Sequence, residues 1–163
     1  RYAIKTVAPA ARIGWDSGGF EEHHRALMGQ YRHLSVFPEA REVLGALREC
    51  GLATGILSNG DPEMLEISVR SAGLDLLLDH VISVHPVRLF KTAPEAYALG
   101  PAATGVSAEQ TLFVSANSWD ALAATWFGFQ TLWLNRQNTP LEETGTAPHH
   151  TGQGLRDVLQ HLD

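Results

Sequence analysis

The stretch ILSNGDP at positions 56–62 decides how this chain is organised. It closes the apolar run Leu52–Leu57, which has the length and low charge of a strand buried on both faces. An aspartate and a proline follow, a pair typical of a helix N-cap and first turn. Between strand and helix stand Ser58 and Asn59, two small polar side chains that form either a simple turn or part of an active site.

Three further apolar runs have the same character, and helices are predicted between them. The runs are His80–Val84, Thr111–Val114 and Thr131–Leu134. Helix signals cover Glu39–Cys50, the segment from Pro62 to Gly73, and Trp119–Phe127, while Pro101 is expected to kink or end a further helix. Alternating strands and helices predict an α/β fold, with a Rossmann-like, doubly wound parallel sheet and right-handed crossovers.

Both ends of the chain differ from this alternating region. Glu21–Tyr31 is predicted to be a helix, but no buried strand alternates with it. We therefore interpret residues 1–34 as part of a separate helical piece and residues 35–163 as the sheet domain. Towards the other end, Thr139–Gly154 is rich in Gly, Pro and Thr and is predicted to be a long surface loop.

Composition excludes several classes of function. The 163 residues are 44% hydrophobic, which suits one packed domain, and the net charge of −6 argues against a nucleic-acid groove. No apolar run approaches the ~20 residues that span a bilayer, so no membrane partner is expected. Cys50 is the single cysteine, which favours a reducing compartment such as the cytoplasm. The adjacent pairs His23–His24 and His149–His150 lack metal-ligand spacing.

Polar side chains follow the predicted strands, at the edge where an open α/β sheet binds ligands. They are Ser58 and Asn59 after the first run, Lys91 after the second, Ser115, Asn117 and Asp120 after the third, and Asn135 and Arg136 after the fourth. Each one taken alone is better explained as a turn residue, a solvated lysine or a first-turn aspartate. Their convergence on one rim indicates a functional site.

These residues, in this order and spacing, resemble the motifs of the haloacid dehalogenase superfamily, and most closely its L-2-haloacid dehalogenase (type II) branch. The stretches that carry the resemblance are ILSNG at 56–60, FK at 90–91 and FVSANSWD at 113–120. Supporting stretches are SVHPVRLFK at 83–91, Tyr97, FGF at 127–129 and WLNR at 133–136. The resemblance covers the chain from about Ser35 onward.

The resemblance implies hydrolytic dehalogenation of small 2-haloalkanoic acids to 2-hydroxy acids, through an ester on an aspartate of the enzyme. By motif, Lys91 would keep the nucleophilic carboxylate ionised, because a nearby cation favours the charged form. Asp120 would help activate the hydrolytic water as a general base. Ser115 and Asn117 would orient the site.

The remaining motif residues are implied to contact the substrate. Ser58 and Asn59 would bind its carboxylate and halide side, while Tyr97 and Trp119 would shape the pocket. The resemblance implies no cofactor, and it suggests a homodimer.

The residue after Ser115 bears on metal dependence. Phosphatases of the superfamily usually carry Gly-Asp at this point, and that aspartate helps to hold Mg²⁺. Here Ala116 offers no oxygen ligand, which predicts a metal-independent enzyme. Ala116 replaces a second serine usual in the dehalogenase branch, and Thr92 replaces a usual proline. Another superfamily hydrolase, such as a phosphatase, and a non-catalytic binding domain or pseudoenzyme stay open as alternatives.

The nucleophile motif of the family, Asp-x-x-Gly-Thr on the first strand, is absent from this sequence. Asp16, in GWDSGG, follows no apolar run and aligns with the family's cap, so we assign it no catalytic role. In the family the first strand is central, between the strands that here end at Leu57 and Val114. Because strands lie ~4.8 Å apart, its omission leaves a slot roughly 10 Å wide.

We therefore expect residues 1–34 to be the C-terminal part of a helical cap, and residues 35–163 to be a core that lacks its first, central strand. On this hypothesis the chain is the C-terminal part of a longer protein and is inactive alone. The alternative is a truncated pseudoenzyme that repacks or pairs with another chain.

Overall fold

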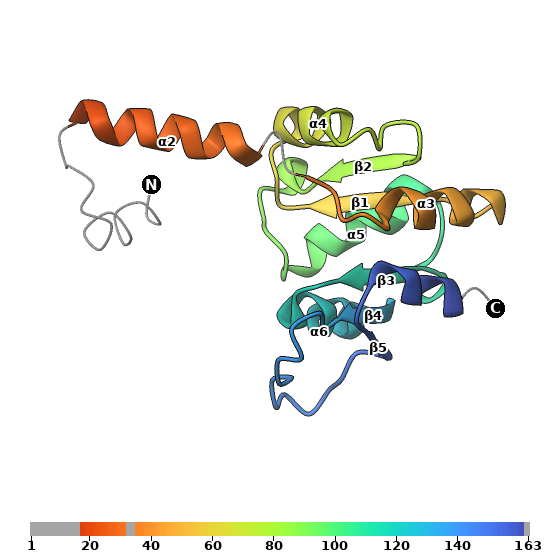
Figure 1. The fold of residues 1–163 in the computed structure, drawn as a ribbon. Coiled ribbons are helices and arrows are strands. Elements are labelled where there is room, and N and C mark those ends of the chain that lie inside the picture. The colour runs from red at the N-terminus through yellow and green to blue at the C-terminus, as the bar shows by residue number, and fades with distance from the viewer. Residues whose placement is uncertain (1–16, 32–34, 162–163) are drawn as a thin grey trace.

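The computed structural model describes residues 17–31 and 35–161 (Figure 1). Asp16 lies outside these ranges. The helices are α2 (Ser17–Tyr31), α3 (Ala40–Glu49), α4 (Pro62–Ser71), α5 (Pro94–Thr104) and α6 (Ser118–Phe127). The strands are β1 (Gly55–Ser58), β2 (His80–Ser83), β3 (Leu112–Ser115), β4 (Gln130–Leu134) and β5 (His150–Gly152). Short 3-10 helices are η1 (His85–Val87), η2 (Ala108–Gln110) and η3 (Leu155–Gln160). Helices that alternate with parallel strands confirm the predicted α/β class.

The parallel strands form two ladders. β1 pairs with β2, and β3 pairs with β4, which pairs with β5. β1 and β3 point the same way in Figure 1, so their carboxyl ends lie on one side of the molecule. Within the described ranges, no strand pairs with the second edge of β1 or of β3. The four strands expected in one sheet are therefore divided between two ladders.

Helix α4 begins and ends where its local sequence predicts. The Asp61 side chain accepts a hydrogen bond from the backbone N–H of Glu63 at 3.0 Å, and Pro62 occupies the first turn. Gly73 follows the helix with φ of 63°, a left-handed conformation that glycine adopts without steric cost. This helix start fixes the direction in which the chain leaves the Ser58–Asn59 turn.

Two hydrophobic clusters pack the helices against the strands. In one, Val43 of α3 packs with residues of β4 and η3, namely Leu132, Leu134 and Val158. In the other, Tyr97, Ala123, Ala124 and Phe129 pack with Leu57 of β1 and Phe113 of β3. The Tyr97 and Phe113 rings meet edge to face, with their centroids 5.6 Å apart. The second cluster joins the two ladders through α5 and α6.

Pro101 does not end its helix. α5 runs without interruption from Pro94 to Thr104, with Pro101 inside it. A proline removes one backbone donor, but Ala96 and Tyr97 of the same helix are fully buried. The apolar contacts of this helix therefore outweigh the loss of one hydrogen bond.

The predicted loop Thr139–Gly154 contains an unexpected strand, β5. Its three residues pair with β4, with His150 opposite Leu132. Asp157 supports the end of this strand, because its Oδ2 accepts the N–H groups of Gln153 at 2.6 Å and Gly154 at 3.2 Å. A strand of His, Thr and Gly carries no apolar run, so sequence periodicity could not reveal it.

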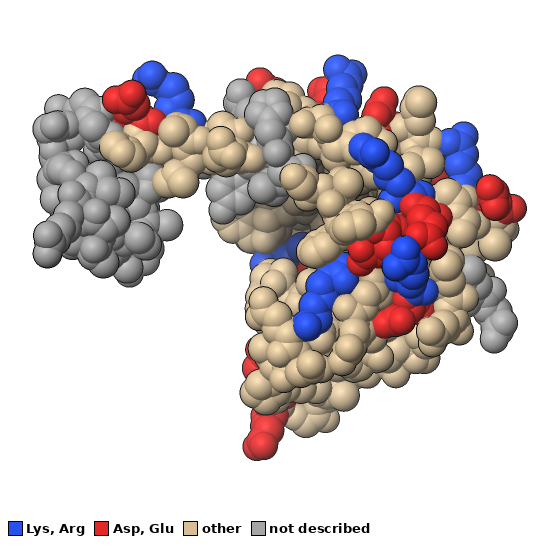
Figure 2. Space-filling view, in the orientation of Figure 1, with Lys and Arg blue, Asp and Glu red and all other residues tan. Residues whose placement is uncertain are grey.

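Charged side chains of both signs lie together over α3 and η3 (Figure 2). Arg156 of η3 pairs with Glu42 of α3, and Arg136 pairs with Glu39 at 3.2 Å. The Arg136 guanidinium also lies 4.0 Å from the centre of the Phe37 ring. The first helix of the core is thus attached to its last element.

Candidate active site

The carboxyl ends of β1 and β3 meet at a buried ion pair between Lys91 and Asp120. The Lys91 Nζ lies 2.8 Å from Asp120 Oδ2, and the two side chains are 11% and 4% exposed. The ammonium also donates to the carbonyl oxygen of Leu57, at the end of β1, over 3.2 Å. Lys91 therefore links the end of one ladder to the helix that follows the other.

The direction of the Leu57 carbonyl locates this lysine at the unpaired edge of β1. The carbonyls of Thr54 and Ser58 accept hydrogen bonds from β2 and its flanking residues. Alternate residues of a strand direct their backbone groups to opposite edges, so Leu57 faces away from β2. Its carbonyl has the Lys91 ammonium as partner instead of a neighbouring strand.

Asp120 is held by three donors, which come from the loop before α5, from α5 and from β3. Besides the Lys91 ammonium, its Oδ2 accepts the Ser115 hydroxyl at 2.9 Å, and its Oδ1 accepts the Tyr97 hydroxyl at 2.7 Å. A carboxylate this deeply buried is stable in the charged state only when it is paired and hydrogen-bonded. The arrangement fixes the orientation of Asp120.

Tyr97 is completely buried, so it contacts Asp120 from inside the protein. Burial, and then the hydrogen bond and negative charge of Asp120, raise the pKa of Tyr97 far above its ordinary value. The phenol therefore remains protonated and remains a donor to Asp120 across the physiological range.

The Asn59 side chain connects the Ser58–Asn59 turn to the backbone of the lysine loop. The Ser58 hydroxyl accepts the N–H of Gly60 at 3.0 Å, and Asn59 Oδ1 accepts the N–H of Lys91 at 2.8 Å. Because Oδ1 accepts that bond, Nδ2 is the end of the amide that can donate to a ligand. The turn thus contributes a hydrogen-bond donor beside the ion pair.

The side chains of Asn117 and Trp119 form no hydrogen bond with Lys91 or Asp120 among the contacts described for these residues. Asn117 is the N-cap residue of α6, and its backbone N–H donates to the Ser115 hydroxyl at 3.2 Å. Trp119, in the first turn of α6, is 44% exposed. Of the predicted site residues, Lys91, Asp120, Ser115 and Tyr97 therefore form one contiguous group. The Leu57 carbonyl was not predicted as part of it, because no side-chain pattern reveals a backbone acceptor.

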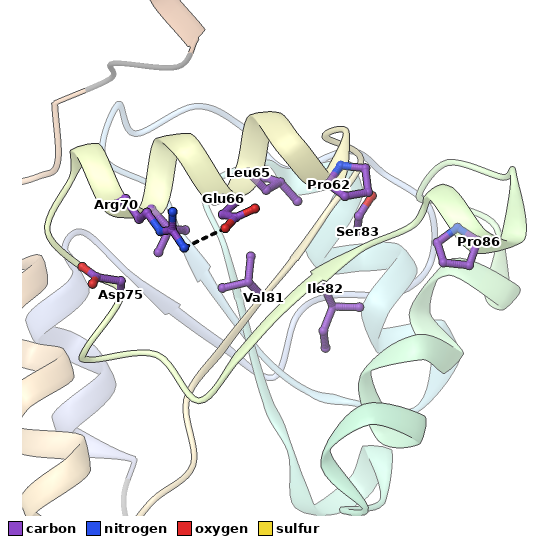
Figure 3. Close-up of a pocket in the computed structure, with 10 residues that line it drawn as sticks. Pro62, Leu65, Glu66, Arg70, Asp75, Val81, Ile82, Ser83 and Pro86 are labelled. Carbon is purple, nitrogen blue, oxygen red and sulfur yellow. Dashed lines mark ion pairs between the residues drawn. The ribbon is translucent and has the colours of Figure 1, made fainter.

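One surface pocket is separate from this group. It has a volume of about 550 Å³ and lies between α4 and β2, where Leu65, Val69, Val81 and Ile82 supply apolar walls (Figure 3). A pocket of about 330 Å³ is lined by Asn59, Gly60 and Phe90. We place the candidate site beside the second pocket, because Asn59, which lines it, accepts the N–H of Lys91 and so connects the pocket to the residue that forms the buried ion pair.

Across residues 17–31 and 35–161, no group of three or more His, Cys, Asp and Glu side chains is placed to hold a metal ion. Nor is any helix in those ranges long and apolar enough to cross a membrane.

Comparison with known proteins agrees with this fold. Residues 9–128 match the haloacid dehalogenase-like hydrolase family. The crystal structure of the L-2-haloacid dehalogenase RSc1362 superimposes with a TM-score of 0.90 and 50% sequence identity, over 98% of this chain and 69% of that one. The chain therefore belongs to the haloacid dehalogenase-like hydrolase family, in its L-2-haloacid dehalogenase branch, as the motifs predicted.

Two curated relatives are also similar over most of this chain. Haloacetate dehalogenase H-2 of Moraxella sp. (strain B) is 41% identical over 136 residues, which are 83% of this chain and 60% of the relative. An (S)-2-haloacid dehalogenase of Pseudomonas sp. (strain YL) is 40% identical over 134 residues, which are 82% of this chain and 58% of the relative. The chain thus spans about 60% of the length of these relatives.

Proposed function

We propose that the protein hydrolyses small 2-haloalkanoic acids to 2-hydroxy acids and halide. The observation that carries the proposal is the buried Lys91–Asp120 pair, which lies at the unpaired edge of β1 and at the end of β3. The names of the similar proteins, which are dehalogenases of haloacetate and of (S)-2-haloacids, support the same substrate class.

The nucleophile in this proposal is an aspartate on a parallel strand between β1 and β3. Two features support that position. Both strands have an edge without a strand partner in the described ranges, and the family resemblance implies a central strand that carries Asp-x-x-Gly-Thr. An aspartate at the carboxyl end of such a strand would lie next to the Lys91 ammonium, which already reaches the end of β1.

The reaction then runs in two steps. A carboxylate oxygen of the nucleophile attacks C2 of the substrate, an ester bond forms, and the halide leaves with the electrons of the carbon–halogen bond. Water next attacks the ester carbonyl carbon, which releases the 2-hydroxy acid, a proton and the free carboxylate. Lys91 keeps the nucleophile ionised in the first step, and Asp120 assists the water in the second.

The same rim binds and orients the substrate. In the proposal Ser58 and Asn59 donate to its carboxylate and halide side, and Trp119 borders the pocket. Ser115 and Tyr97 hold Asp120 in place, and Asn117 orients the start of α6.

Three finer points belong to the proposal. The reaction needs no metal, because Ala116 stands where superfamily phosphatases carry a cation-binding aspartate. The protein works in a reducing compartment such as the cytoplasm, which suits its single cysteine, Cys50. It forms a homodimer, which light scattering after size-exclusion chromatography would measure.

Halide release is the direct test. The product of the complete reading frame is incubated with 2-chloropropionate, and chloride and lactate are measured in parallel with the 163-residue chain. We expect equal amounts of chloride and lactate from the former. If hydrolysis of a phosphate ester is found instead, with no chloride released, the function proposed here is wrong.

A further inference from the structure

Ser83, the last residue of β2, bonds to both loops of the candidate site. Its hydroxyl donates to the carbonyl oxygen of Gly60 at 2.6 Å and accepts the backbone N–H of His85 at 3.1 Å. Gly60 belongs to the turn that carries Ser58 and Asn59, and His85 begins the segment that leads to Lys91. One hydroxyl group therefore uses its donor and an acceptor position on two different loops.

The position of Ser83 follows from the register of the β1–β2 ladder. Ser58 and Ser83 are directly paired across the two strands, so both strands end at the same level. Two loops that leave neighbouring strands at one level diverge unless something joins them. Ser83 joins them at their base, and the bond from the Lys91 N–H to Asn59 Oδ1 joins them further out.

Gly60 has little freedom to move within the turn. A side chain at Gly60 would meet Leu65 of α4 at 2.9 Å, so the turn is already packed closely against that helix. The Ser58 hydroxyl accepts the Gly60 N–H, and the Ser83 hydroxyl donates to the Gly60 carbonyl. Both backbone groups of Gly60 are thus bound by serine hydroxyls at the ends of the two strands.

We infer that Ser83 is a positioning residue, which couples the substrate-binding turn of Ser58 and Asn59 to the loop that carries Lys91. It acts through Gly60 and His85 and does not touch the reacting atoms. The kinetic consequence rests on the proposed function, whereas the coupling itself rests on the hydrogen bonds alone.

The surroundings of Ser83 allow a conservative replacement. Its side chain lies beside Pro62 and contributes to the wall of the pocket between α4 and β2 (Figure 3). That pocket provides space for the extra methyl group of threonine, while the hydroxyl is retained. Ser83→Thr is therefore the rescue variant for Ser83→Ala, and Ser107→Ala is the matched control. Ser107 bonds to Gln110 through its hydroxyl and lies near the opposite ends of the strands.

Amide hydrogen exchange on the 163-residue chain tests the coupling without any assay of activity. In Ser83→Ala we expect exchange to be faster at the His85 amide, which loses its acceptor, and also at the Gly60 and Lys91 amides, whose N–H groups bind Ser58 and Asn59 and not Ser83. The expected increase is roughly three- to tenfold, the effect of one lost hydrogen bond. Ser83→Thr and Ser107→Ala should match the wild type. If His85 alone changes, the inference is overturned.

Kinetics of the complete protein provide the second readout. A misplaced turn and lysine should lower kcat/KM for 2-chloropropionate by about 10- to 100-fold in Ser83→Ala, mainly through a higher KM, with Ser83→Thr within about threefold of wild type. An unchanged kcat/KM overturns the positioning role. If the wild type releases no halide while Gly60 and Lys91 still exchange faster in Ser83→Ala, the proposed function fails and the coupling stands.

Discussion

At the scale of single residues, the ion pair of Lys91 and Asp120 is expected to contribute to stability and, in the proposed mechanism, to chemistry. Replacing Lys91 by Met leaves the Asp120 carboxylate buried without its cation, and the loss of one partner of a buried pair costs about 3–5 kcal/mol. The double variant Lys91→Met/Asp120→Asn removes both charges and should recover most of that stability. Urea unfolding of the 163-residue chain measures both effects.

The double variant should recover stability without recovering activity. Lys91→Met and the double variant should both lose roughly 10²–10⁴-fold in rate of halide release, since each lacks the cation beside the nucleophile. Arg70→Ala is the control, because Arg70 forms an exposed ion pair with Glu66 on α4. A double variant that is both stable and active would show that the pair is only structural.

Asp120→Asn should separate the two chemical steps. In the proposed mechanism, attack on the substrate and loss of halide do not need Asp120, but hydrolysis of the ester does. We therefore expect an enzyme–substrate adduct to accumulate, visible in the intact mass of the protein after it is mixed with 2-chloropropionate. Asp75→Asn, an exposed change in the other pocket, should show no adduct. Absence of the adduct in an inactive Asp120→Asn protein would contradict this division of roles.

The carboxylate of Asp157 makes stability depend on pH. Hydrogen bonds from the N–H groups of Gln153 and Gly154 hold the pKa of Asp157 below its ordinary value of 3.8. The unfolded chain therefore binds the proton first, and Asp157 stabilises the fold fully above that value. This contribution is lost as the pH falls through the lower pKa of the folded state. Asp157→Asn should lower the urea midpoint at pH 6, and the difference from wild type should shrink below pH 3.8.

At the scale of elements, the unpaired edge of β1 has a measurable signature. The alternation along β1 directs the Leu57 backbone to the free edge and the Ile56 backbone to β2. In the 163-residue chain the Leu57 amide should therefore exchange quickly and the Ile56 amide slowly. In the product of the complete reading frame, a strand between β1 and β3 would protect both amides. Fast exchange at Leu57 in both proteins would show that no strand fills this position.

The strands and helices differ in how well the sequence predicted them. The apolar runs around β1, β2, β3 and β4 were found because each excludes charged side chains over four or five residues. Burial on both faces was predicted for all four, but in the structure only β4 is mostly buried, and β1 and β2 are mostly half-buried. β5 was missed because its polar residues are held by one neighbouring strand and by Asp157. Pro101 was expected to kink or end its helix, and it does not end α5; the local rule contains no information on the burial of Tyr97.

The candidate site was also predicted in part: two of its residues were expected to lie close together, but their hydrogen-bond partners were not. Lys91 and Asp120 are 29 positions apart, yet the carboxyl ends of parallel strands meet at one edge, so their proximity followed from the fold class. The partners that orient them could not be read in the same way. The Leu57 carbonyl and the Ser83 hydroxyl contribute through strand register, which only the folded chain determines.

At the scale of the whole molecule, metal dependence distinguishes the proposed dehalogenase from a phosphatase. The two would differ in what occupies the neighbourhood of Asp120. Here the Lys91 ammonium lies 2.8 Å from its Oδ2, in a place where a cation cofactor would be repelled. We expect halide release by the complete protein to survive dialysis against EDTA. A strict requirement for Mg²⁺, restored on its addition, would favour the phosphatase.

The attachment of α3 to η3 has a consequence for biosynthesis. Glu39 bonds to the N–H of Leu155, which lies 116 positions later in the chain. At roughly 5–20 residues per second, a ribosome adds those residues in about 6–23 s. Throughout that interval Val43 and the rest of the apolar face of α3 lack the partners they have in η3. The nascent core therefore leaves the apolar face of this amphipathic helix without its η3 partners until Leu155 and Val158 emerge from the ribosome.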